Sequence, residues 1–513
     1  MSTLAVRNLA PRIRAVSQLP VTRNVPTSTR LLGSLSGKAQ LPIGSSPSNS
    51  AGISKPTTLD SRVFPVHYSS SSYSATSHPS ADLQATDISI TFPSSPAQSI
   101  TLPYIWLRDS CPCPSCVHPS TRQKLHRTSD VPLDIKPKRL TWVHSLDKDA
   151  KWALEVEWDR PLWKHDTGST GVEGHTAAAG HVGGEGHRSQ YSERWLKTWS
   201  DESKVKERNQ DSALSMIPWL AKDLAEEGGK SKLFFSYNEV QRDEKALLGA
   251  LKQLTNYGLT VLRDVPTTIT GEWELEKVAN LLSHVRETFY GPLWDVRSLA
   301  AARNVAYTDL DLDLHMDLLY FENPPRYQLL HCLRNRNVTG GQSIFVDALQ
   351  AAQTLWKEDR EAFNLLATTD VGFHYINDGH HLAQRHKTIV VDPSSDPSSS
   401  SPPKITAINY SPPFQAPLPS STPPAFYQAL QKFAATLRRP EGRWEYLLKE
   451  GDVVVFDNRR VLHARRAFSG GSNGASAAGK KDAECNRWLK GCYVEADAVA
   501  DRIRVLGTKL RVE

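Results

Sequence analysis

The spacing His315-Met316-Asp317, followed far downstream by His463, constrains the fold of this chain more than any other feature. Residues i and i+2 of an extended strand point to the same face, so His315 and Asp317 can hold one metal ion while Met316 turns away. His463 directly follows two separate apolar stretches, 453–456 and 461–462, which are typical of further strands. Two imidazoles and one carboxylate form the facial triad that binds non-haem Fe(II) and leaves positions open for O₂ and a co-substrate. The spacing therefore predicts a β-rich fold with an iron site between distant strands.

Composition and charge narrow the classes of partner. The chain has 513 residues, 39% apolar and 23% charged, which is typical of a globular enzyme with two or three domains. Seven of its 61 Lys and Arg residues lie in residues 1–59, which contain no Asp or Glu, and this leaves 54 basic against 55 acidic side chains. A nucleic-acid binder would need a basic surface on its folded part, and a membrane span would need about 18 consecutive apolar residues. We therefore expect neither nucleic acid nor membrane as a partner.

Residues 1–80 differ from the rest of the sequence. They are rich in Ser, Pro, Thr and Ala, carry five dispersed arginines before residue 31, and lack the continuous apolar core of a secretory signal. This composition predicts a mitochondrial transit peptide and a disordered linker, with a disordered basic tail on a cytoplasmic protein as the alternative. Six cysteines in so long a chain argue against a disulfide scaffold and indicate a reducing compartment.

Two folded domains are expected after this segment. Alternating apolar residues predict a small all-β domain over residues 85–200, with a Gly-, His- and Thr-rich flexible insertion inside it, and a larger domain over 230–513. The larger domain combines short strands with few helices, which favours a jelly roll. The expected strands are 88–92, 100–102, 139–143, 152–158, 258–262, 328–332 and 343–346; the expected helices are 245–254 and 272–289; the insertion is 165–186; and the expected surface loops are 392–403, 411–424 and 470–483.

Three cysteines within six residues, Cys111, Cys113 and Cys116, indicate a metal site in the small domain. Thiolates this close repel one another unless a cation neutralises them, and Zn²⁺ takes three thiolates and one imidazole in a closed tetrahedral site. The site should therefore be structural. The candidates for the fourth ligand are His118, His187 and, in the flexible insertion and so less restrained, His175 and His181.

Three blocks of sequence together resemble a known family. Residues 106–113 with Gly186-His187-Arg188-Ser189-Gln190-Tyr191, residues 304–341 around His315 and Asp317, and residues 456–466 around His463 are similar to the γ-butyrobetaine dioxygenase and trimethyllysine dioxygenase family of taurine-dioxygenase-like oxygenases. The resemblance runs from about Ile88 to the C-terminus. It implies a mainly β fold with flanking helices: a double-stranded β-helix (jelly-roll) oxygenase domain plus a small N-terminal β domain that binds zinc, with His187 as its fourth ligand.

The resemblance also implies the chemistry. Members of this family use Fe(II) and 2-oxoglutarate to hydroxylate an unactivated C–H bond, with ascorbate as reductant. Arg487, before a Leu-x-Gly-x-Tyr stretch, would pair with the distal carboxylate of 2-oxoglutarate, and Ser343 would add a hydroxyl contact. The insertion at 470–483 lengthens the gap between His463 and Arg487, so Arg465 remains an alternative.

The family's substrates end in a trimethylammonium group, which aromatic faces hold because it has no N–H to donate. The positions that match the family's aromatic cage are Tyr290, Trp294, Tyr307 and Tyr493. Asn304 would hydrogen-bond the substrate carboxylate. Asn409 is a second candidate for that role, although the Pro-rich segment after it departs from the family's pattern.

Three functions follow as hypotheses. The first is hydroxylation of γ-butyrobetaine to L-carnitine, the last step of carnitine biosynthesis, because residues 328–332 and 463–466 look more like that branch. The second is hydroxylation of trimethyllysine, the first step of that pathway. The third is a zinc-stabilised interaction protein without activity, which intact His315, Asp317, His463 and Arg487 argue against. The resemblance also implies a homodimer formed partly through the N-terminal domain.

Overall fold

The computed structural model describes residues 78–93, 97–162, 187–209, 214–225, 232–268, 271–297, 309–396, 399–470 and 486–510. The expected transit peptide, the 165–186 insertion and nearly all of the 470–483 loop lie outside the described residues, as do Asn304 and Tyr307. In the described part of the chain, no helix combines the length and apolarity needed to cross a membrane.

The N-terminal module, residues 80–208, contains two antiparallel three-stranded sheets. Strand β2 alternates strictly, with Ile88, Ile90 and Phe92 buried against the core and its other residues half-exposed. That core continues through Trp158 and Tyr191 of the second sheet, so both sheets share it. The elements are β1 (Ser80–Leu83), β2 (Asp87–Phe92), β3 (Gln98–Pro103), α1 (Tyr104–Asp109), β4 (Pro137–His144), β5 (Trp152–Trp158), β6 (Arg188–Ser192), α2 (Glu193–Trp199) and α3 (Glu202–Arg208).

The C-terminal unit, residues 214–510, is built on two larger sheets. The seven-stranded sheet has the order β10-β23-β12-β20-β8-β7, with β9 also paired to β23, and only its β7–β8 pair is parallel. Near-continuous burial of β8, β12 and β20 matches their central positions, because such strands are covered on both faces. The strands are β7 (Phe234–Ser236), β8 (Leu259–Arg263), β9 (Val285–Arg286), β10 (Trp294–Arg297), β12 (Tyr327–Asn335), β20 (Val453–Asp457) and β23 (Arg487–Val494).

The four-stranded sheet has the order β11-β21-β14-β19 and faces the seven-stranded sheet. Phe345 and Val461 from the smaller sheet pack against Val454, Phe456 and Leu330 from the larger, so apolar side chains fill the space between the two sheets. Two facing sheets of short strands are the expected jelly-roll arrangement. The smaller sheet comprises β11 (Leu312–His315), β14 (Ser343–Asp347), β19 (Arg443–Tyr446) and β21 (Val461–Arg465); the two-stranded pairs are β13 (Val338–Gly340) with β22 (Phe468–Gly470), β15 (Asp370–Asn377) with β16 (His380–Lys387), and β17 (Ile389–Val391) with β18 (Ile405–Ile408).

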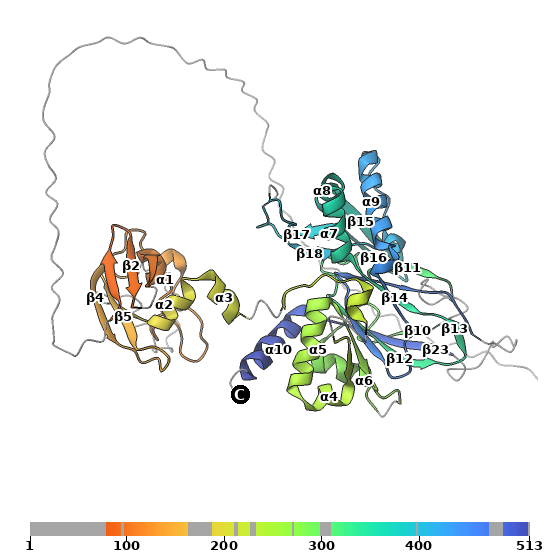
Figure 1. Ribbon diagram of the computed structural model, residues 1–513, viewed down its shortest axis with the longest axis horizontal. Coiled ribbons are helices and arrows are strands. Elements are labelled where there is room, and N and C mark those ends of the chain that lie inside the picture. Colours follow the sequence, from red (N-terminus) through yellow and green to blue (C-terminus); the bar gives the residue numbers. More distant parts are fainter. Residues whose placement is uncertain are drawn as a thin grey trace, which may run out of the picture. The chain divides into compact units, whose positions relative to one another are not determined.

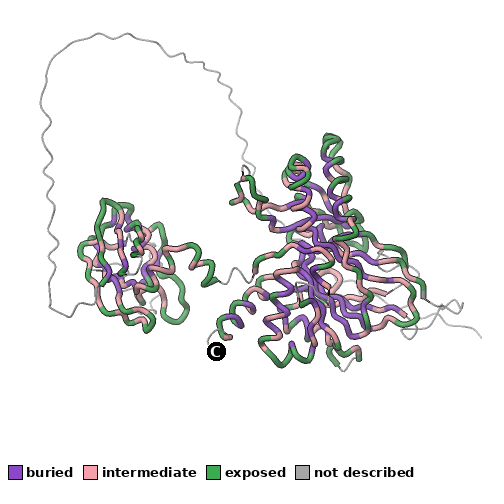
Figure 2. Tube along the Cα trace, viewed as in Figure 1, coloured by how far each residue is buried: buried purple, intermediate pink, exposed green. Residues whose placement is uncertain are grey.

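Helices cover the outer faces of both sheets (Figure 1). One set packs its apolar stripes against the seven-stranded sheet: α4 (Tyr237–Arg242), α5 (Glu244–Tyr257), α6 (Glu274–Leu282) and α10 (Ala496–Lys509). The other set packs against the four-stranded sheet: α7 (Ala348–Glu358), α8 (Arg360–Thr368) and α9 (Pro424–Leu437). The buried residues accordingly run through the middle of the unit, between the helices (Figure 2).

Two boundaries differ from the sequence-based expectations. Helix α6 ends at Leu282 rather than near residue 289, because Val285 and Arg286 pair with β23 as a short strand and leave the helical hydrogen-bond pattern. The chain also joins the core of the C-terminal unit before residue 230. Trp219 is buried and its backbone N–H donates to Asp347 Oδ2 at 3.0 Å.

Candidate active site

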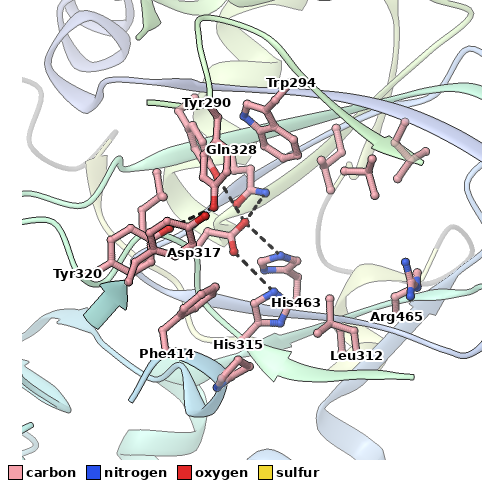
Figure 3. Close-up of a pocket in the computed structure, with 18 of the residues that line it drawn as sticks. Tyr290, Trp294, Leu312, His315, Asp317, Tyr320, Gln328, Phe414, His463 and Arg465 are labelled. Atoms are coloured by element: carbon pink, nitrogen blue, oxygen red, sulfur yellow. Dashed lines mark hydrogen bonds and ion pairs between the residues drawn. The ribbon is translucent and has the colours of Figure 1, made fainter. Parts of the chain in front are cut away.

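Three side chains from two strands and a turn converge between the sheets. His315 ends β11 and lies opposite His463 in the register of β21, and the centroids of their imidazole rings are 4.1 Å apart. Asp317 Oδ1 lies 3.6 Å from His315 Nε2, and Asp317 Oδ2 lies 3.7 Å from His463 Nε2. Figure 3 shows the three side chains pointing toward one another. The structure thus assembles the donor set that the sequence predicted.

The chain reaches this geometry by a turn rather than by the expected continuous strand. Strand β11 stops at His315, and Met316 is buried with its N–H donating to Tyr410 O. The side chain of Asn458 then holds the backbone of Asp317 on both sides: it accepts from the Asp317 N–H and donates to the Asp317 carbonyl, each at 2.9 Å. The prediction of a shared strand face was therefore wrong in its detail, although the side chains of His315 and Asp317 do lie together.

Both imidazoles are suited to bind a metal. The Nδ1 of His315 lies 2.8 Å from the carbonyl of Asp313 and donates to it, which leaves Nε2 as the nitrogen that faces Asp317. Burial, together with the nearby His315, lowers the pKa of His463 to about 3, which keeps this ring neutral at physiological pH. Two imidazoles and a carboxylate on one side of a cavity match the donor set that Fe(II) takes in non-haem oxygenases.

A cavity of about 360 Å³ opens beside these ligands. Two buried arginines, Arg465 on β21 and Arg487 on β23, line it together with Ser343, which lies opposite Arg465 in the β14–β21 register. The guanidinium groups of Arg465 and Arg487 lie over the Phe468 ring at 4.9 and 5.2 Å. Arg465 also donates to the carbonyl of Leu310 at 2.7 Å. A buried arginine and a hydroxyl near the triad fit the carboxylate of a co-substrate such as 2-oxoglutarate.

Aromatic rings form another wall of the same cavity. Tyr290, Trp294 and Tyr493 line it, and the Trp294 and Tyr493 rings are 5.4 Å apart at an interplanar angle of 36°. Asn304 and Tyr307, the other expected substrate contacts, lie outside the described residues. Asn409 is not among the residues that line the cavity; it is buried and its side-chain amide donates to Lys387 O, a structural contact.

Sequence reasoning missed further residues that line the cavity, among them Tyr320, Tyr375, Phe414 and Gln328. The hydroxyls of Tyr320 and Tyr290 are 3.4 Å apart, so Tyr320 extends the aromatic wall. Phe414 belongs to the short helix Pro412–Phe414, inside the 411–424 stretch that was expected to be only a surface loop. This short helix reaches the cavity because Ser411, just before it, is buried and Gln415, just after it, forms a β-bridge with Phe373 of β15. Gln328 lies in the 328–332 block that the resemblance included, without a role assigned to it.

The N-terminal module contains a second cluster of metal-ligating atoms. His187 Nε2 lies 3.6 Å from Cys111 Sγ, 4.0 Å from Cys113 Sγ and 3.5 Å from Cys116 Sγ. Zn–S bonds of about 2.3 Å and a Zn–N bond of about 2.0 Å at tetrahedral angles put sulfur and nitrogen about 3.5 Å apart, so the cluster has the dimensions of a zinc site. His118 is placed elsewhere, in a turn where its Nδ1 lies 3.1 Å from Ser120 Oγ.

Comparisons with known proteins agree with this geometry. Residues 221–493 match the model of the taurine catabolism dioxygenase TauD, TfdA family, and residues 81–168 match that of the γ-butyrobetaine hydroxylase-like N-terminal domain. Dioxygenase str8 of Strobilurus tenacellus is 44% identical over 406 residues, 79% of this chain and 85% of that protein. The γ-butyrobetaine dioxygenase of Pseudomonas sp. (strain AK-1) is 32% identical over 405 residues, 78% and 89% of the two chains. The mitochondrial trimethyllysine dioxygenase of Rattus norvegicus is 30% identical over 407 residues, 79% and 82%.

Proposed function

The chain belongs to the TauD, TfdA family of 2-oxoglutarate-dependent dioxygenases, and we propose that within this family it hydroxylates γ-butyrobetaine to L-carnitine. The observation that carries the proposal is the juxtaposition, in one cavity, of the His315–Asp317–His463 triad with the aromatic wall of Tyr290, Trp294 and Tyr493. Aromatic faces attract a quaternary ammonium group through their negative π-clouds. A substrate held there by its trimethylammonium end would lie against the metal ligands.

The roles of the chain's own residues follow from this placement. His315, Asp317 and His463 would hold Fe(II), which supplies the chemistry that couples oxidation of 2-oxoglutarate to succinate and CO₂ with hydroxylation of a C–H bond. Arg487 would pair with the distal carboxylate of 2-oxoglutarate and Ser343 would hydrogen-bond it. Apolar side chains such as Leu312 and Leu330 line the cavity beside these groups and would limit access of water.

The charge of the cavity supports γ-butyrobetaine over trimethyllysine. Trimethyllysine carries an additional α-ammonium group, which would call for an acceptor, most favourably a carboxylate. Asp317 is the one carboxylate among the described residues that line the cavity, and the proposed metal would occupy it. γ-Butyrobetaine has no such group to satisfy. Trimethyllysine remains the second candidate because of the likeness to the rat enzyme.

Three further parts of the proposal concern the rest of the chain. The Cys111, Cys113, Cys116 and His187 cluster would bind a structural zinc ion, supported by its tetrahedral dimensions. The basic, acid-free composition of residues 1–59 supports a mitochondrial location. The match to a γ-butyrobetaine hydroxylase-like N-terminal domain is the ground for proposing a homodimer, which sedimentation analysis of the purified protein would test.

A paired turnover assay tests the proposed substrate. The protein would be supplied with Fe(II), 2-oxoglutarate and ascorbate, and then with γ-butyrobetaine or trimethyllysine in separate reactions read by mass spectrometry. We expect carnitine from the first and little product from the second. Hydroxytrimethyllysine alone would contradict the proposed substrate. The His315→Ala variant serves as the control, and turnover that survives this change would support an assignment other than the iron site described here.

A further inference from the structure

The side chain of Gln328 contacts Asp317, one of the proposed metal ligands. The residue lies on β12 in the wall of the cavity, its side chain is buried, and its Nε2 donates to Asp317 Oδ2 at 2.9 Å. Figure 3 shows the amide directed at the carboxylate. An ionised carboxylate only accepts hydrogen bonds, so Asp317 fixes which end of the amide faces it. The amide oxygen Oε1 therefore turns away from Asp317, and in the part of the chain that the structure describes it has no donor.

The hydroxyl of Tyr493 is a second donor to Asp317 Oδ2. It lies 3.4 Å from this oxygen, and Tyr493 is the register partner of Gln328 in the β12–β23 pair. Two adjacent strands of the seven-stranded sheet thus direct donors at one oxygen of a carboxylate that belongs to the turn after β11. Asp317 Oδ1 has neither of these contacts and lies nearest to His315 Nε2.

We propose that Gln328 is a positioning residue that restricts Asp317 to a single ligating oxygen, Oδ1, with Tyr493 as the secondary donor. This inference rests on the iron-binding role proposed above for Asp317. Hydrogen bonds to Oδ2 engage its lone pairs and prevent the carboxylate from rotating until both oxygens face the metal. A carboxylate that bound through both oxygens would fill a position that the facial triad leaves open for co-substrate and O₂.

The arrangement also joins the aromatic wall to the metal ligands. The ring of Tyr493 packs against Trp294, whereas its hydroxyl reaches Asp317. One side chain therefore touches both the place of the substrate's cationic end and the carboxylate that would hold the metal. The hydroxyl and the ring can be separated experimentally, because Tyr493→Phe removes only the hydroxyl.

Binding of Co(II), a spectroscopic substitute for Fe(II), tests the inference in the full-length protein without turnover. Gln328→Leu removes the amide, and Gln328→Glu keeps its size and shape but replaces the donor with an acceptor. Loss of a group that orients a metal ligand weakens metal affinity about 10- to 100-fold, so we expect the Kd for Co(II) to rise by that factor in both variants, with a changed visible spectrum. A merely space-filling role would leave the Kd of Gln328→Leu close to that of wild type, because leucine fills a similar volume without adding a charge.

The matched control is Gln253→Leu. Gln253 is also buried and donates through Nε2 to a carbonyl, that of Leu259, but it lies on α5 away from the cavity. This variant should lose stability while keeping wild-type Co(II) affinity. A second readout is the ratio of succinate to hydroxylated product, which should rise clearly above one in the Gln328 variants and stay near one in the control.

The outcomes separate this inference from the proposed function. Co(II) affinity within twofold of wild type in Gln328→Leu and Gln328→Glu, with the product ratio unchanged, would overturn the positioning role. A wild-type protein that binds Co(II) through His315 but leaves γ-butyrobetaine unchanged would overturn only the proposed substrate. If the Gln328 variants fail to fold, Tyr493→Phe provides the test. Loss of one long hydrogen bond to the carboxylate should raise the Kd for Co(II) about twofold to tenfold, and wild-type affinity would be the contradicting result.

Discussion

Gly491 lies directly beneath the indole ring of Trp294: a Cβ atom at position 491 would come within 2.4 Å of Trp294 Cη2. The two residues are register partners in the β10–β23 pair, so the ring crosses the neighbouring strand at the point where that strand has no side chain. The ring can therefore lie against the backbone and still face Tyr493. The aromatic wall depends on this glycine for its shape.

Gly491→Ala should accordingly displace Trp294 and weaken substrate binding. We expect the KM for the trimethylammonium substrate to rise about tenfold, because the cation–π contribution of a desolvated ring is about 1–2 kcal/mol. Steady-state kinetics at saturating 2-oxoglutarate would measure this KM. Gly442→Ala is the matched control, since a Cβ at that position would meet no atom within 4 Å. Equal KM values in both variants would show that Trp294 does not contact the substrate.

The positive charge of the substrate should matter more than its shape. The neutral isostere 5,5-dimethylhexanoate replaces the quaternary nitrogen of γ-butyrobetaine with carbon and keeps the chain length and carboxylate. An aromatic cage predicts that this analogue competes about 3- to 30-fold more weakly than γ-butyrobetaine, from about 0.5–2 kcal/mol of cation–π attraction. Inhibition constants measured against γ-butyrobetaine turnover would show this difference. Equal affinity would mean that the cavity recognises only apolar bulk.

The two arginines of the cavity should differ in their effect on 2-oxoglutarate. Arg487→Ala is expected to raise the KM for 2-oxoglutarate about tenfold or more, because a charge-assisted hydrogen bond contributes about 1.5–3 kcal/mol. Arg465→Ala should have the smaller effect, since Arg465 already donates to the carbonyl of Leu310. If succinate-formation kinetics showed a larger rise in this KM for Arg465→Ala than for Arg487→Ala, Arg465 would be the residue that binds the carboxylate.

The zinc proposal predicts different results for two variants of the N-terminal module. Cys113→Ser should lose zinc and lower the thermal stability of the module, because metal binding contributes to its folding. His118→Ala should keep one zinc ion per chain, since His187 is the imidazole that lies within 4.0 Å of all three sulfurs. Elemental analysis of the purified proteins gives the metal content. Full zinc occupancy in folded Cys113→Ser would contradict the site.

Acid should destabilise the C-terminal unit partly through His331. Burial lowers the pKa of His331 to about 4, below the value of about 6.5 expected in the unfolded chain. The unfolded state therefore binds a proton that the folded state does not, so stability falls as pH decreases from about 6.5 toward 4. Denaturant unfolding of His331→Leu should show a shallower loss of stability across this window than wild type. Parallel pH profiles of the unfolding free energy in the two proteins would show that His331 does not contribute to the acid sensitivity.

Sequence reasoning was most successful where chemistry imposes spacing. His315, Asp317 and His463 could be predicted because Fe(II) needs these ligand types and the His-x-Asp spacing can be recognised in the sequence itself. Tyr320, Tyr375 and Phe414 could not, because each is an ordinary aromatic residue whose place in the cavity depends on how a turn, a hairpin and a short helix pack together. The helix predicted over 272–289 runs past the observed end of α6 at Leu282, because the apolar pattern after Leu282 fits a short edge strand as well as a helix.

The most direct test of the central claim uses ¹⁸O₂. In the reaction of 2-oxoglutarate, O₂ and γ-butyrobetaine to succinate, CO₂ and carnitine, one atom of O₂ enters succinate and the other enters the new hydroxyl group. Mass spectrometry of both products should show ¹⁸O in succinate and in carnitine, formed in equal amounts and absent with His315→Ala. Succinate labelled in the absence of any carnitine would leave the dioxygenase chemistry intact and contradict γ-butyrobetaine as the substrate.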